Sequence, residues 1–238
     1  MTVVARGIAR PPTRLVTSRG LIVPAYFHPA VAAADWRALR VAGAAVRAVV
    51  LNAADGPGDA PERELAAAAA ATGRPLLGYV DTKYGARPHG DVLLDIRRHR
   101  EWYPTIGVFM DRVASDKASL AGYVRLVDEI RRFGPGLVVL NHGAYPHPGY
   151  AALADTMVTF EGSHAAYQEM EVPGWARRLP AARFCHLVYD TPGHLLGTTL
   201  KQAAAHHAGA VFVTDRGGAN PWDGLPPYFA AQASAWAV

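Results

Sequence analysis

Short apolar runs recur along the chain, and each is followed by turn residues and then by an amphipathic stretch rich in Ala, Leu and Arg. Short runs of apolar and β-branched residues predict buried strands, and the longer amphipathic stretches predict helices. This alternation is typical of βα units, whose parallel strands are covered by crossover helices. The predicted strands span residues 21–27, 46–52, 76–80, 106–110, 137–140, 156–160, 183–188 and 210–214.

Eight such units in one chain predict a closed (β/α)₈ TIM barrel of the α/β class rather than an open sheet. The length of 238 residues suits one such barrel, for which about 250 residues are usual. No linker divides the chain, so we assign residues 21–238 to a single barrel domain and residues 1–20 to a partly ordered N-terminal extension. The clearest predicted helices span residues 35–42, with Asp35 as a cap, 61–72, 119–133 and 198–207.

The composition fits a folded protein with few specialised partners. Hydrophobic residues make up 50% and charged residues 18%, and the net charge of +4 is spread along the chain, so we expect neither nucleic acid nor membrane as a partner. The oligomeric state is left open. Without a secretory signal we expect a cytoplasmic protein, or a secreted one if a leader was removed. Cys185, the single cysteine, is predicted to be a buried structural thiol.

Polar and aromatic residues stand where nearly every predicted strand ends. In β/α barrels these ends and the following loops line one shared mouth, which makes their side chains candidates for binding a substrate. Some of these residues are also ordinary turn formers, so the turn interpretation stays open for Asp81. The candidates for substrate binding are Tyr26, His28, Asn52, Tyr79, Asp81, Tyr84, Arg112, Asn141, His142, Tyr189, Asp215 and Trp222.

Two carboxylates, Asp111 and Glu161, directly end apolar runs and are the candidate catalytic residues. A carboxylate beside an apolar core is costly unless it has a partner or a chemical task. Two such groups across a barrel mouth can split a glycosidic bond, one as proton donor and the other as nucleophile or charge stabiliser. The surrounding aromatic rings offer flat faces to the C–H groups of a sugar. The pattern therefore predicts a carbohydrate ligand.

Neither a metal nor a cofactor is predicted. The chain contains no HxH or HExxH spacing, and a zinc site built from separate strands is the weaker alternative. A Gly-rich phosphate loop with its lysine is absent, and so is a GxSxG elbow, so a nucleotide-dependent reaction is not expected.

Several collinear motifs make the chain resemble the spherulation-specific family 4 (spherulin-4-like) proteins, over roughly residues 21–228. The resemblance implies a (β/α)₈ barrel related to glycoside hydrolases that act on galactosamine-containing exopolysaccharide. It also implies that Asp111 and Glu161 are the important acids, with Asp81, Tyr84 and Asn141 in the same groove. The motifs include Val23-Pro-Ala-Tyr26-Phe, Leu77-Gly-Tyr-Val-Asp-Thr-Lys-Tyr-Gly85, Gly107-Val-Phe-Met-Asp111, Val138-Val-Leu-Asn141 and Asn220-Pro-Trp-Asp-Gly-Leu-Pro226.

The chain departs from the family pattern at Arg112, where the family commonly has Glu after the strand-four Asp. We expect this cation to lower the pKa of Asp111 and to suit an anionic sugar. Three functions remain open at this point. They are a glycoside hydrolase for an amino-sugar polymer or oligosaccharide, a catalytically silent carbohydrate-binding barrel, and an intracellular enzyme that acts on another small polar ligand.

Overall fold

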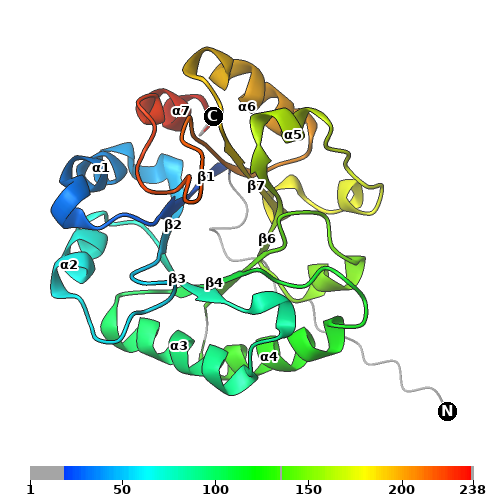
Figure 1. The fold of residues 1–238 in the computed structure, drawn as a ribbon. Helices are drawn as coiled ribbons and strands as arrows, with labels where there is room; N and C mark the ends of the chain where they lie inside the picture. Colours follow the sequence, from blue (N-terminus) through cyan, green and yellow to red (C-terminus); the bar gives the residue numbers. More distant parts are fainter. Residues whose placement is uncertain (1–18, 135, 237–238) are drawn as a thin grey trace.

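The computed structural model describes residues 19–134 and 136–236, and it confirms the predicted barrel (Figure 1). Eight parallel strands close in sequence order, with β8 pairing back onto β1. Residues 1–18 of the predicted N-terminal extension, residues 1–20, lie outside the described residues. The strands are β1 Gly20–Ala25, β2 Val46–Leu51, β3 Leu76–Asp81, β4 Gly107–Asp111, β5 Leu137–Asn141, β6 Thr156–Ser163, β7 Phe184–Tyr189 and β8 Ala210–Val213.

Every predicted run overlaps one of these strands, because both faces of each strand are covered and nearly every residue in it is buried. The largest difference is at β6, which continues to Ser163 instead of ending at Phe160. Its pairing with β7 shifts register between Val158 and Phe160. Such an irregularity re-aims the side chains that follow it, and Glu161 lies directly after it.

Helices surround the barrel, but the predicted start of the first helix is wrong. Helix α1 begins at Pro29, where His28 caps it by accepting a hydrogen bond from the Ala30 amide at 3.2 Å. Asp35 instead accepts from the Leu225 amide at 3.1 Å. The helices are α1 Pro29–Ala42, α2 Arg63–Ala71, α3 His89–Trp102, α4 Leu120–Arg132, α5 His164–Gln168, α6 Leu196–Ala205 and α7 Phe229–Trp236.

The crossover between β5 and β6 has a short 3₁₀ segment, Pro148–Ala152, in place of an α-helix. Within the described ranges no helix is both long and apolar enough to cross a bilayer.

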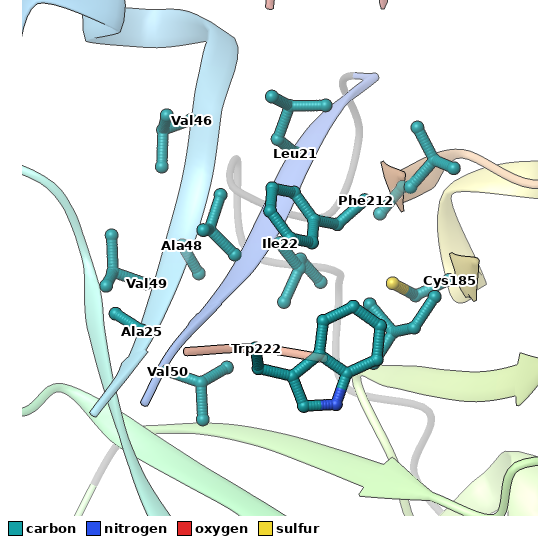
Figure 2. Packing of buried hydrophobic residues seen from close by; sticks show 14 of the residues in the cluster. Leu21, Ile22, Ala25, Val46, Ala48, Val49, Val50, Cys185, Phe212 and Trp222 are labelled. Atoms are coloured by element: carbon teal, nitrogen blue, oxygen red, sulfur yellow. The ribbon is translucent and has the colours of Figure 1, made fainter. Parts of the chain in front are cut away.

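The core joins the barrel strands to the segment between β8 and α7 that carries Trp222 (Figure 2). The Trp222 ring packs 5.9 Å from that of Phe212 on β8, and both side chains are buried. Burying an aromatic side chain of this size contributes about 1.5–3 kcal/mol, so this packing fixes the indole firmly. Cys185 is fully buried, as predicted, and burial raises the pKa of its thiol to about 12.

Candidate active site

A cavity of about 530 Å³ opens at the carboxyl ends of the strands. Its walls combine acidic, amide and aromatic side chains, which is the combination that the strand ends predicted. The lining contains seven predicted residues: Tyr26, Asn52, Tyr79, Asp111, Glu161, Tyr189 and Trp222. The remaining lining residues are Ala53, Asp55, Gly218, Ala219, Asn220 and Pro221.

The two predicted catalytic carboxylates are joined by one amide. The Nδ2 atom of Asn141 donates to Asp111 Oδ1 at 2.6 Å and to Glu161 Oε2 at 2.5 Å. An Asn amide nitrogen has two protons, so it can serve both acceptors at once. The other end of the same amide, Oδ1, accepts from the Gly143 backbone at 3.0 Å, which fixes the orientation of the side chain.

A second donor reaches each carboxylate from the opposite side. The Tyr79 hydroxyl donates to Asp111 Oδ2 at 2.8 Å, and the Trp222 indole donates to Glu161 Oε1 at 3.1 Å. The Trp222 backbone carbonyl also accepts from the Tyr26 amide at 3.2 Å, which ties the segment after β8 to the end of β1. All four carboxylate oxygens of the pair therefore have a fixed donor.

The surroundings of the pair raise both carboxyl pKa values. Burial raises the pKa of Asp111, although hydrogen bonds from Tyr79, the Arg112 backbone and Asn141 oppose the shift. Burial also raises the pKa of Glu161, and the negative charge of Asp111 raises it further, against hydrogen bonds from Asn141 and Trp222. None of the ion pairs between described residues involves either carboxylate. The pKa of Asp111 is therefore raised overall and not lowered as expected, because burial has the largest effect and the Arg112 guanidinium is bound to Asp81.

Arg112 is bound to a different acid, Asp81. Its Nε donates to Asp81 Oδ1 at 2.9 Å, and Nη2 donates to Oδ2, which makes the contact bidentate. The Arg112 backbone is left-handed, with a φ of 47°, at the point where the chain leaves β4. Asp81 also accepts from the Lys83 amide at 2.7 Å. Neither member of this ion pair lines the cavity.

Asn141 contacts both carboxylates but does not itself line the cavity, and four further candidates for substrate binding also lie outside the lining: His28, Tyr84, His142 and Asp215. His28 caps α1 and contacts Glu62 at 2.9 Å. Tyr84 is 63% exposed, and Asp215 lines a separate apolar groove between α1 and α7. His142 is 8% exposed, and burial lowers its pKa to about 4. The structure gives these four residues packing, capping or surface positions.

Comparisons with known proteins agree with this architecture. The family model described as spherulation-specific family 4 matches residues 20–236. The chain therefore belongs to spherulation-specific family 4. It is 28% identical over 235 residues to Spherulin-4 of Physarum polycephalum, covering 90% of this chain and 69% of that protein. It also superposes on the crystal structure of Aspergillus clavatus Sph3 in complex with N-acetylgalactosamine (GalNAc), with a TM-score of 0.77 and 24% identity, covering 95% of this chain and all of that chain.

Two polar residues of this spherulation-specific family 4 barrel line the cavity and were not predicted as site residues: Asp55 and Asn220. Asp55 stands in an Asp-Gly-Pro-Gly sequence, which is typical of a turn and hides any second role. Asn220 accepts a hydrogen bond from the Trp222 amide at 3.1 Å, so it shapes the turn that positions the indole. The motif Asn220 to Pro226 was the available signal for this residue.

Asp111 and Glu161 have side chains that are able to act as acid, base or nucleophile. A carboxylic acid and a carboxylate that contact one amide nitrogen can deliver a proton and stabilise a developing positive charge on the same ligand. Across the described residues no group of three or more His, Cys, Asp or Glu side chains is arranged to hold a metal ion.

Proposed function

We propose that this chain is a glycoside hydrolase that cleaves a polysaccharide or oligosaccharide containing amino sugars, with Asp111 and Glu161 as its catalytic residues. The observation that carries this proposal is the double hydrogen bond from Asn141 Nδ2, at 2.6 and 2.5 Å, which holds both carboxylates at one cavity. Paired carboxylates with an oxocarbenium-like transition state between them are the common machinery of glycosidases.

The comparisons support the substrate class. The Aspergillus clavatus Sph3 crystal holds GalNAc, which is an amino sugar, and that protein shares the fold of this chain. The cavity walls support it as well, because four aromatic residues, Tyr26, Tyr79, Tyr189 and Trp222, line the space. Tyr26 and Tyr79 meet edge to face at 5.3 Å, and Tyr189 and Trp222 at 6.2 Å. Such rings complement the apolar faces of a sugar.

The surroundings of the two acids give them different roles. Burial raises both pKa values, but three hydrogen bonds oppose the shift at Asp111, whereas two oppose it at Glu161, where the charge of Asp111 adds to the effect of burial. We assign Glu161 as the general acid, which gives its proton to the leaving glycosidic oxygen. Asp111 stays ionised and either attacks the anomeric carbon or stabilises its positive charge. Glu161, now ionised, then accepts the proton of the water that completes hydrolysis.

The spacing of the carboxylates favours retention of the anomeric configuration. Asp111 Oδ1 and Glu161 Oε2 contact the same nitrogen, so they lie closer together than the roughly 6.5 Å that leaves room for a water in inverting enzymes. Retaining enzymes hold their carboxyl groups about 5–5.5 Å apart. The first product released should therefore keep the anomeric configuration of the substrate.

The presence of Arg112 supports a second candidate function, that of a carbohydrate-binding barrel without catalytic activity. Arg112 replaces the Glu that the family resemblance places after Asp111, which leaves Asp111 and Glu161 as the acids available for catalysis. A silent barrel would bind sugars in the same cavity and release no product.

Product release from glycans containing galactosamine, glucosamine or uronic acid separates the two candidates. We expect release by the native chain and at least a 100-fold lower kcat for Glu161→Gln and for Asp111→Asn, since each removes a group that acts at the reacting bond. The matched control is Glu169→Gln, an exposed acid just after α5, which should retain native kcat. Equal turnover by Glu161→Gln would contradict the assignment. Calorimetric sugar binding without release by the native chain would identify the silent barrel.

A further inference from the structure

The outer surface of α1 and α7 is apolar, unlike that of α3 and α4 across the barrel (Figure 1). Eleven residues of α1 and α7 are exposed, and of these only Arg37 and Arg40 are charged. Eleven residues of α3 and α4 are also exposed, and seven of them are charged. On α1, Val31 is 87% and Val41 is 82% exposed. A single exposed valine is ordinary, but a connected apolar face on a folded protein is typical of an interaction surface.

A groove borders α1 on each side. The groove between α1 and α7 has a volume of about 840 Å³, and its lining includes Val41, Leu225 and Phe229. The groove between α1 and α2 has a volume of about 290 Å³, and its lining includes Ala33 and Trp36. Helices pack by placing the ridges of one surface into the grooves of another. The exposed ridge of α1 with a groove on either side therefore offers the relief that a second helical surface can interlock with.

The two grooves carry opposite charges. Arg37 and Arg40 line the groove between α1 and α2, whose described lining contains no acid. Asp215 lines the groove between α1 and α7, where Arg216 is already paired with Asp223 at 2.7 Å. None of the ion pairs between described residues involves Arg37, Arg40 or Asp215. The two sides of α1 are therefore complementary to each other in charge, and a second copy of this surface can satisfy both.

The apolar face is large enough for a stable dimer. Sixteen residues of α7, α1 and α2 are exposed, and further residues that line the two grooves add to them. A standard protein–protein interface uses about 20–30 residues from each partner. Charged residues are depleted from the core of such interfaces, as they are from the exposed surface of α1 and α7.

We propose that this face is a homodimer interface in which α1 packs against α1 of a second copy, about a two-fold axis parallel to the helix. Because α1 lies between α2 and α7, such an axis sets the α2 side of each α1 against the α7 side of the other (Figure 1). The Arg37 side of one protomer then faces the Asp215 side of its partner, twice by symmetry. Both barrel mouths open in the same direction. The inference goes beyond the proposed function and does not rest on it.

The molar mass in solution tests the dimer first. We expect light scattering and sedimentation equilibrium of the native chain at micromolar concentration to give twice the 25.4 kDa mass of one chain. A mass of one chain that persists as the concentration rises would overturn the inference. The measurement requires no turnover, so a monomer that cleaves glycans refutes the dimer alone, and a dimer that cleaves none refutes the proposed hydrolase alone.

Val41→Glu tests the place of the interface. The side chain is already exposed in one copy, so the fold should persist, but the dimer would have to bury the new charge. We expect the dissociation constant of the dimer to rise at least tenfold, with an unchanged circular dichroism spectrum. Val124→Glu, the same change at an exposed valine of α4, is the control and should keep the native constant. A native constant in Val41→Glu would overturn the proposed interface.

Thiol labelling of Val41→Cys identifies what covers the face. The native thiol of Cys185 is fully buried, so the new thiol is the one that reacts. We expect labelling to slow as the protein concentration rises, because a second copy then covers position 41. Protection that is equally strong at every concentration would show a different occupant and overturn the inference.

A charge exchange tests the direction of the two-fold axis. Arg37→Asp places like charges opposite each other twice, so we expect the dissociation constant of the dimer to rise about tenfold. Adding Asp215→Arg to this variant should return the constant to within about threefold of the native value. The control is Arg132→Asp, an exposed cation at the end of α4, which should leave the constant unchanged. A double variant that dimerises no more tightly than Arg37→Asp would overturn the proposed arrangement.

Discussion

Asp81 and Asp111 are register partners at the ends of β3 and β4, yet their surroundings differ. Asp81 receives a bidentate guanidinium from Arg112, whereas Asp111 receives only neutral donors and faces Glu161 through Asn141. An acid that already has its counter-charge contributes to the fold. An acid that lacks one retains an attraction for a positively charged ligand or transition state.

The Asp111–Glu161 pair, which has no positively charged partner among the described residues, should lower the stability of the fold. Two partly buried carboxylates without a cation repel each other and lose hydration, and neutral hydrogen bonds restore only part of that loss. Active sites are commonly built this way, because groups arranged for a transition state are strained in its absence. The Asp111–Glu161 pair and the Asp81–Arg112 pair should therefore respond oppositely in measurements of turnover and stability.

The largest effect is expected from Asn141, whose amide nitrogen both catalytic carboxylates share. Asn141→Leu leaves two acceptors without their common donor, so we expect kcat to fall about 100-fold. It also removes hydrogen bonds to the charged forms, which raises both carboxyl pKa values. The acid limb of the pH–rate profile should therefore move to higher pH, which misfolding alone would not cause.

Asn141→Asp is the companion variant. It keeps the shape and the acceptor for the Gly143 amide, but it has no nitrogen donor and adds a third negative charge. We expect a loss of kcat at least as large as in Asn141→Leu. Native turnover in Asn141→Asp would show that the shared donor is unnecessary.

A smaller effect is expected in the pH dependence of stability. Because the pKa of Glu161 is raised, the folded chain binds more protons than the unfolded chain between the ordinary value, about 4.3, and the raised one. Within that window the free energy of unfolding contributed by this group falls as pH rises. Glu161→Gln lacks this contribution, so its stability should decline less with rising pH in urea unfolding between pH 4 and 7.

The buried histidines change stability with pH in the opposite direction, and they are present in both the native chain and Glu161→Gln. Burial lowers the pKa of His99 and of His142 to about 4, so their contribution is present above about pH 6.5 and is lost as the pH falls towards 4. The difference between the native and Glu161→Gln curves cancels this contribution. A difference that does not vary with pH would contradict the raised pKa of Glu161.

The barrel could be predicted from sequence because its signal is local and repeated. Each strand is a buried run, and its burial on both faces removes polar residues from the pattern. Helix α1 was harder, since its cap is His28 and its first turn contains a non-helical residue, Ala32, so the usual capping signal is absent. The crossover after β5 gave no helix signal, and the structure has a 3₁₀ segment there.

For the site, the sequence could predict mainly the residues that stand at or near the ends of strands. Sequence placed Asp111, Glu161, Tyr79 and Trp222 together because barrel strand ends converge. It paired Arg112 with Asp111 because they are adjacent, but a left-handed turn at Arg112 brings the guanidinium to Asp81. Partners of this kind depend on backbone direction across strands, which no pattern along one chain encodes.

The contrast between the Asp111–Glu161 pair and the Asp81–Arg112 pair is tested most directly by measuring turnover and thermal unfolding for both Glu161→Gln and Asp81→Asn. We predict that Glu161→Gln loses at least 100-fold in kcat. Asp81→Asn should keep kcat within about threefold and lose about 1 kcal/mol of stability, which lowers Tm by a few degrees. The loss is modest because the Arg112 side chain is 47% exposed. A large loss of kcat in Asp81→Asn, together with native turnover in Glu161→Gln, would contradict the assignment of the catalytic centre.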